Sequence, residues 1–246
     1  MQFGKSEKYN KLLAIANNLF QARIFVPLSA LALLVLLHYF FFASPAHSAQ
    51  RLVVPIGTPE EASVRTLLEK RVIKNSAAFI VALRLEGISR IAPGAYDIPA
   101  GADAFGVAHA LKTPSSRWVI IAEGLRKEEI ARILQKALAW DRATEADFIR
   151  AASGLCASEI GAEEGCLFPD TYLVPVRAGA ATAAKILFNQ FREQFGPLAP
   201  ELVRQNVKYK TAVNVAALVP REAGGTDEMS LISGIIWNRL IMGMKL

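Results

Sequence analysis

Histidine and cysteine are scarce in this chain, which has 246 residues but only three histidines and two cysteines. His38 lies inside an apolar run and His47 just after it, so a globular part would contain only His109. The sequence also lacks a CxxC pair, an HExxH or GxSxG motif and a Walker-type glycine loop. These absences argue against a Ser-His-Asp triad, a histidine-rich metal site and most nucleotide-binding proteins.

The two cysteines, Cys156 and Cys166, are separated by only a short stretch of chain. If this region lies outside the cytoplasm, the pair could form one disulfide that closes a short loop. Two buried thiols are the alternative, and the sequence leaves both open.

Positive charge is concentrated at the N-terminus. The net charge is +6, and residues 1–23 contain four basic residues against the single acid Glu7. A nucleic-acid-binding domain should carry its basic excess on its folded surface. We therefore predict that nucleic acid is not a partner.

Residues 24–43 (IFVPLSALALLVLLHYFFFA) contain no formally charged side chain. A stretch of ~20 apolar residues is long enough to cross a bilayer as a helix. The basic residues before it predict a cytoplasmic tail (1–23), a transmembrane helix (24–43) and a linker (44–50), with the rest of the chain outside the cytoplasm. The alternative is a cleaved signal peptide, with Ser48-Ala49 resembling a cleavage site.

Beyond the linker, the pattern predicts an α+β fold in two parts. Residues 51–116 are predicted to form a compact unit of strand, two helices, strand and helix, with a turn at Pro93-Gly94. The second part, 117–246, is predicted to be a mostly helical mixed α/β domain. Its expected elements are a strand at 118–122, helices at 127–140, 144–153, 181–195, 211–222 and 228–240, and an ordered loop at 161–175.

The segment Val215–Glu222 is a candidate for chemistry. At helical spacing, Val215, Leu218, Val219 and Glu222 share one face. A carboxylate at the end of an apolar face tends to be desolvated, which raises its pKa and suits a general acid. A helix-terminal glutamate that reaches into water is the alternative, and the pattern alone favours it.

Five segments, in order, resemble the endolytic murein transglycosylases of the YceG-like family. Glu164–Tyr172 (EGCLFPDTY) is the most specific, because it is similar to the family's "EGyLfPDTY". The others are Ile91–Tyr96 (IAPGAY), Ala122–Leu125 (AEGL), Ala216–Glu222 (AALVPRE) and Ile235–Leu246 (IIWNRLIMGMKL).

The resemblance implies that 51–116 is a LysM-like subdomain and that 117–246 is the catalytic domain, with its C-terminal part missing beyond Leu246. It implies an enzyme that cleaves the β-1,4 bond after N-acetylmuramic acid within nascent glycan strands and leaves 1,6-anhydro ends. Glu222 falls on the family's essential glutamate, and no metal or cofactor is implied. The resemblance also gives substrate-groove candidates: Glu164, Asp170, Tyr172 and Asn238. Asp170 and Asn238 could equally brace turns.

The same resemblance implies a single-pass protein of the inner membrane, with peptidoglycan and wall-synthesis proteins as partners. One departure concerns Pro220, which stands where the family usually has a first glutamate. A proline inside a helix removes a backbone donor and can kink the helix. The rival hypothesis is therefore a membrane-anchored wall-binding or scaffold protein without catalysis.

Overall fold

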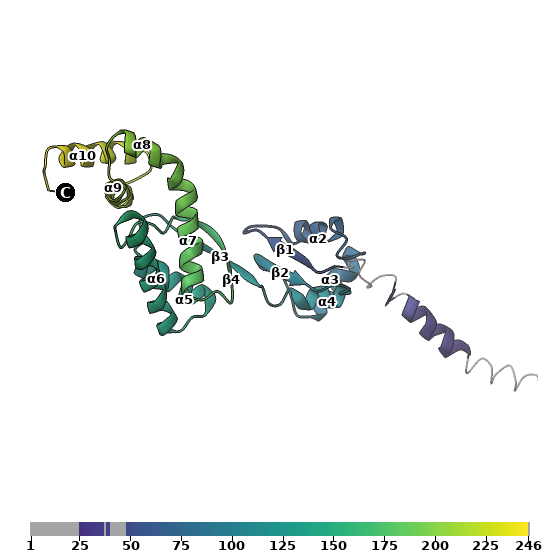
Figure 1. Cartoon of the computed structure of the whole chain (residues 1–246). Helices are drawn as coiled ribbons and strands as arrows, with labels where there is room; N and C mark the ends of the chain where they lie inside the picture. Colours follow the sequence, from purple (N-terminus) through teal and green to yellow (C-terminus); the bar gives the residue numbers. More distant parts are fainter. Residues whose placement is uncertain (1–24, 37, 40–47, 246) are drawn as a thin grey trace, which may run out of the picture. The chain divides into compact units, whose positions relative to one another are not determined.

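The computed structural model describes residues 25–36, 38–39 and 48–245 (Figure 1). Together these residues have the predicted α+β character. The four strands are hydrogen-bonded in the order β1-β2-β3-β4. The chain divides into two compact units, and each is described by itself. Unit 1 contains 58–91 and 97–113, and unit 2 contains 53–57, 92–96 and 114–246.

The prediction of a transmembrane helix at 24–43 was wrong. The helical residues described there are 25–36 and 38–39, and residues 24, 37 and 40–43 lie outside the described residues. In the part of the chain that the structure describes, no helix combines the length and the apolar character that a bilayer crossing requires. The predicted tail, 1–23, and most of the linker, 44–50, also lie outside the described residues.

Unit 1 is built on three helices, α2 (Glu60–Glu69), α3 (Ser76–Leu85) and α4 (Ala104–Ala110). The side chain of Asn75 accepts a hydrogen bond from the Ala78 amide, so this residue caps α3. Asp103 caps α4 in the same way through the Gly106 amide. The core side chains of unit 1 include Leu67, Phe79, Leu83 and Val107, none of which is exposed.

Two long-range antiparallel strands form the frame of unit 2. β3 (Ser116–Ile121) pairs with β4 (Asp170–Pro175), with Val119 opposite Tyr172. β1 (Gln50–Val54) and β2 (Gly94–Ile98) extend the sheet, and Ala95 of β2 lies opposite Ser116 of β3. The Trp118 indole N–H donates to the Val54 carbonyl at 2.9 Å.

Three helices pack with β3 and β4 around the main core of unit 2. They are α5 (Lys127–Leu138), α6 (Arg142–Ile160) and α7 (Ala180–Phe195), and α6 lies beside α7 (Figure 1). The core of fully or nearly fully buried side chains includes Leu134, Phe148 and Leu187 from these helices, and Val119 and Val174 from the strands. Burial of such side chains is the main stabilising contribution.

The remaining elements are a 3-10 turn, η1 (Gly196–Leu198), and helices α8 (Ala199–Arg204), α9 (Tyr209–Glu222) and α10 (Met229–Ile241). Two predictions from the sequence were wrong in unit 2. The helix expected at 144–153 extends over α6, where Asp141 caps its start through the Thr144 amide. The loop expected at 161–175 ends in the strand β4, because residues 170–175 pair with β3.

The loop between α6 and β4 is held by a disulfide between Cys156 and Cys166, whose Cα atoms are 5.4 Å apart. This separation lies within the usual range for a disulfide. Both cysteines are buried with Ile160, Phe188 and Phe191 in a second core cluster. Of the two alternatives left open by the sequence, the structure has the disulfide.

The same loop rests against α9 at Gly165. This glycine has φ +97°, and a Cβ placed on it would overlap the Cγ1 atom of Val213 in α9. Val213 is buried in the second core cluster. Gly165 therefore lets the loop backbone approach the helix more closely than any other residue would allow.

The disulfide should stabilise unit 2 by about 2–3 kcal/mol, because it closes a loop of roughly ten residues in the unfolded chain. We expect the double variant C156A/C166A to unfold at lower urea concentration than the oxidised wild type. The measurement is urea unfolding with and without a reducing agent. The double variant is its own control, because reductant should leave its midpoint unchanged. A wild-type midpoint that does not move on full reduction, verified by thiol titration, would contradict the expectation.

Gly165→Ala should lower the free energy of unfolding by about 2–4 kcal/mol, through the positive φ and the overlap with Val213. Gly161→Ala is a matched control, because Gly161 also has a positive φ, +68°, but has open space around its Cβ position. It should cost only about 1 kcal/mol. Adding Val213→Ala should reduce the cost of Gly165→Ala, as measured by a double-mutant cycle in urea. If Gly165→Ala lowers the free energy of unfolding equally with and without Val213→Ala, the overlap with Val213 is not the cause of the destabilisation.

Candidate functional site

Glu222 is the last residue of α9, and its side chain is exposed. The apolar face on which it lies is formed by Val215 and Val219, which pack with Ile236 of α10. Both valines are buried, but the helix ends before the carboxyl group enters this cluster. The side chain of Glu222 therefore lies outside this cluster and reaches into solvent, which is the alternative that the sequence pattern alone favoured.

Pro220 lies inside α9 without ending it. The helix continues through Pro220 to Glu222, and the Ala223 amide donates to the Val219 carbonyl at 3.0 Å. Proline has no amide hydrogen, so the carbonyl four residues earlier, that of Ala216, loses its usual donor. Ala216 is exposed, so water can satisfy this carbonyl.

Arg221 ties the end of α9 to the turn that follows β3. Its guanidinium donates to the Gly124 carbonyl at 3.4 Å, and its Cγ would lie 3.5 Å from a Cβ on Gly124. The motifs Ala122–Leu125 and Ala216–Glu222, which are far apart in the sequence, thus meet in space. Glu222 is the residue next to this contact.

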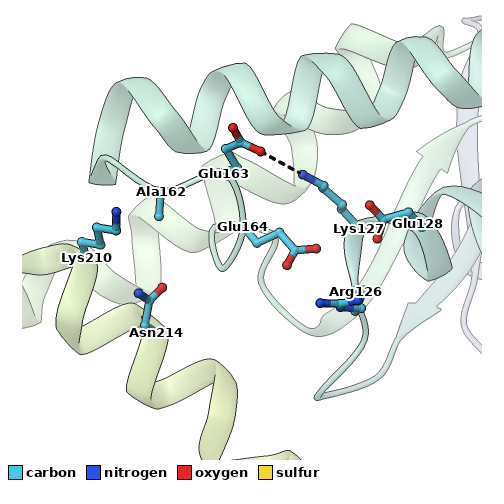
Figure 2. Close-up of a pocket in the computed structure, with 8 residues that line it drawn as sticks. All are labelled: Arg126, Lys127, Glu128, Ala162, Glu163, Glu164, Lys210 and Asn214. Carbon is cyan, nitrogen blue, oxygen red and sulfur yellow. Dashed lines mark ion pairs between the residues drawn. The ribbon is translucent and has the colours of Figure 1, made fainter. Parts of the chain in front are cut away.

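A hollow of about 430 Å³ opens between the start of α5, the loop after α6 and the first turns of α9. Glu164 is the one predicted site residue in its lining (Figure 2). Lys127 and Glu163 form an ion pair across it at 3.7 Å. The lining residues are Arg126, Lys127, Glu128, Ala162, Glu163, Glu164, Lys210 and Asn214.

Asp170 is the exposed first residue of β4. One carboxylate oxygen accepts the Thr171 amide at 2.6 Å, and the other accepts the side-chain amide of Gln190 at 2.7 Å. These bonds connect the start of β4 to α7, which agrees with a bracing role. Contact with a substrate stays a prediction for this residue.

Tyr172 is buried within the main core of unit 2. Its hydroxyl donates to the Phe168 carbonyl. Burial, and to a lesser degree the nearby Asp170 carboxylate, raise the pKa of this hydroxyl far above its ordinary value. Tyr172 therefore holds the Leu167–Pro169 segment through the Phe168 carbonyl, which is the hydrogen-bond partner of its hydroxyl.

Asn238 lies on α10 with an exposed side chain. Its backbone carbonyl accepts a hydrogen bond from the Met242 amide at 3.0 Å, and Met242 caps the C-terminal end of α10. Its role in substrate binding stays a prediction. Within the described residues, no group of three or more His, Cys, Asp or Glu side chains could hold a metal ion.

Among the lining residues that the sequence reasoning missed are Arg126, Lys127, Lys210 and Asn214. They come from two helices that are far apart in the chain, and only the fold brings them together. The one signal available was the spacing of Lys210 and Asn214, which are four residues apart and therefore share a face of a helix.

Comparison with known proteins gives a family and a structural likeness. No curated protein matches this chain. A crystal structure of a YceG-like protein from Listeria monocytogenes is similar, with a TM-score of 0.50 and 18% identity, over 81% of this chain and 72% of that one. At this identity the likeness concerns the fold alone. The model of the YceG-like family matches residues 52–246. Because this match covers most of the chain, the protein belongs to the YceG-like family.

Proposed function

We propose that this protein is an endolytic lytic transglycosylase of peptidoglycan. It cleaves the β-1,4 bond between N-acetylmuramic acid and N-acetylglucosamine within glycan strands and leaves a 1,6-anhydro end. The observation that carries the proposal is the family match over residues 52–246. Glu222 is proposed as the essential glutamate because Ala216–Glu222 resembles the family's motif.

Glu222 serves as both acid and base in this mechanism. Its protonated carboxyl gives a proton to the glycosidic oxygen, and the bond from that oxygen to C1 breaks. The C6 hydroxyl oxygen of the same sugar then bonds to C1, and the Glu222 carboxylate takes the hydroxyl proton. Glycosidases generally need a second carboxyl to activate water or to attack the sugar. Here the sugar supplies the nucleophile, so one carboxyl is sufficient.

The surroundings of Glu222 support this role. Its exposure leaves the carboxyl open to a polymer that approaches from solvent. The neighbouring contact between Arg221 and the Gly124 carbonyl restrains the helix end that carries Glu222. Glu164, Asp170 and Asn238 have exposed or partly exposed side chains and are the proposed substrate-contacting residues, whereas the hydroxyl of Tyr172 acts through the Phe168 backbone.

The disulfide supports a location outside the cytoplasm, since disulfides persist mainly in oxidising compartments. Peptidoglycan glycan strands are reached from that side. Wall-synthesis proteins are the proposed protein partners, because the enzyme would act on strands as they are made.

Glu222→Gln should reduce the release of 1,6-anhydro products from purified glycan strands by about 100-fold or more, because the amide cannot transfer the proton. The measurement is chromatography and mass spectrometry of the soluble products. Glu193→Gln, at an exposed position of α7, is the control and should keep full activity. The proposal fails if wild type releases anhydro ends and Glu222→Gln releases them at the same rate.

Pro220 favours one second candidate, a wall-binding protein without turnover. In that case the full chain co-sediments with peptidoglycan sacculi but releases no anhydro products. Pro220→Glu restores the residue that the family usually has at this position, and it also restores the backbone donor to Ala216. If wild type is inactive and this variant is active, the proline is the cause. If both are inactive while both bind sacculi, the second candidate is correct.

A further inference from the structure

The hollow beside α9 (Figure 2) presents charges of both signs to the same space. Arg126 and Lys127 come from the start of α5, Lys210 comes from α9, and Glu163 and Glu164 come from the loop between α6 and β4. Lys210 and Asn214 lie on one side of the view, Arg126 and Lys127 lie on the other, and Glu164 projects between them.

Only part of this charge is neutralised within the protein. Lys127 is well buried, with 14% of its side chain exposed, and it bonds to the Ser153 hydroxyl at 2.9 Å as well as pairing with Glu163. In the described part of the chain, the side chains of Arg126, Glu164 and Lys210 have no ion-pair or hydrogen-bond partner. The Glu128 side chain also lines the hollow and has no such partner among the described residues. The hollow thus has one fixed ammonium group and four charged side chains that are free to bind.

The mixture of charges restricts the ligand. A simple anion would meet the carboxylates of Glu163 and Glu164, and a simple cation would meet Arg126 and Lys210. No aromatic side chain lines the hollow, so it lacks a platform on which a sugar ring could stack. A short peptide that carries both carboxylates and an ammonium group can pair with all of these residues at once.

The hollow also lies at a suitable distance from Glu222. Asn214 precedes Glu222 by eight residues on α9, which corresponds to about 12 Å along a helix. An extended peptide covers this distance in about four residues, at roughly 3.3 Å per residue. The opposite wall begins at Arg126, two residues after Gly124, which Arg221 contacts next to Glu222.

We infer that the hollow binds the peptide branch of the glycan strand and so selects peptide-bearing strands over bare ones. Arg126 and Lys210 pair with carboxylates of the branch, Glu164 pairs with its side-chain ammonium, and the Asn214 amide binds its backbone. Lys127 is held in position by Ser153 and Glu163. This inference rests on the proposed function for the identity of the strand, but peptide binding can be measured without turnover.

The test uses the full chain and the synthetic tetrapeptide N-acetyl-L-Ala–γ-D-Glu–L-Lys–D-Ala, in which the lysine side chain carries the only ammonium group, with binding measured by calorimetry at low salt. We expect Glu164→Gln and Lys210→Gln each to weaken binding by up to about fivefold, because each removes one charge pair. Glu193→Gln and Lys185→Gln on α7 are the matched controls, since both positions are exposed and remote from the lining, and their binding should equal that of wild type.

A second peptide, acetylated on its lysine side chain and therefore lacking the side-chain ammonium, identifies the partner of Glu164. It should bind wild type more weakly, and Glu164→Gln should have no further effect on it, whereas Lys210→Gln should still weaken it. Glu222→Gln should bind the free tetrapeptide as wild type does, even though its turnover is lost. The inference is overturned if the tetrapeptide does not bind or if the hollow variants bind it like the α7 controls, and either result leaves the test of Glu222 unaffected.

Discussion

The contact between Gly165 and Val213 is the constraint on which the rest of the proposed site depends. The loop after α6 can approach α9 this closely only because residue 165 has no Cβ. The disulfide at the neighbouring Cys166 holds the loop from its other side, on α6. Held in this way, the loop places Glu163 and Glu164 opposite Lys210 and Asn214.

Local signals predicted much of the fold, and long-range pairing explains the failures. The cap of α3 by Asn75 is a local signal of this kind, because capping depends on neighbouring residues only. The strand β4 was missed because Pro169 and Pro175 enclose it and suggest a loop. Its pairing with β3, across a long separation in sequence, makes it a strand. Likewise, α6 continues through Gly154 because Cys156 and Ile160 are buried beyond it.

The failure at the N-terminus has a different cause. Composition alone suggested a helix of bilayer length at 24–43, but no helix in the described part of the chain is long and apolar enough to cross a membrane. An apolar run indicates which residues avoid water, and it does not by itself fix the length of a helix.

For the candidate site, the pattern of residues placed Glu222 at the end of an apolar face and favoured a side chain that reaches into water, and the side chain is exposed. The face is apolar because α9 packs against α10, and that packing ends one turn before the carboxyl. Only the family resemblance singled out Glu222 over an ordinary helix-terminal glutamate. The hollow was beyond sequence reasoning altogether, since its cations come from α5 and α9 and its Glu164 carboxylate from the loop between α6 and β4.

One helix connects the two functional proposals. α9 carries Lys210 and Asn214 in its first turns and Glu222 at its end, so the helix that lines the proposed peptide-binding hollow also carries the proposed catalytic carboxyl. Pro220 lies between these two regions, where it removes one helical hydrogen bond close to the carboxyl. The loss of this hydrogen bond loosens the helix end, whereas the contact of Arg221 with Gly124 restrains it. This contact joins the helix end to the segment that leads into Arg126. The position of Glu222 relative to the hollow is therefore set from both sides, by α9 itself and by the turn after β3. Substrate bound in the hollow would add a third link between the same two elements and hold Glu222 at a fixed place along the glycan strand.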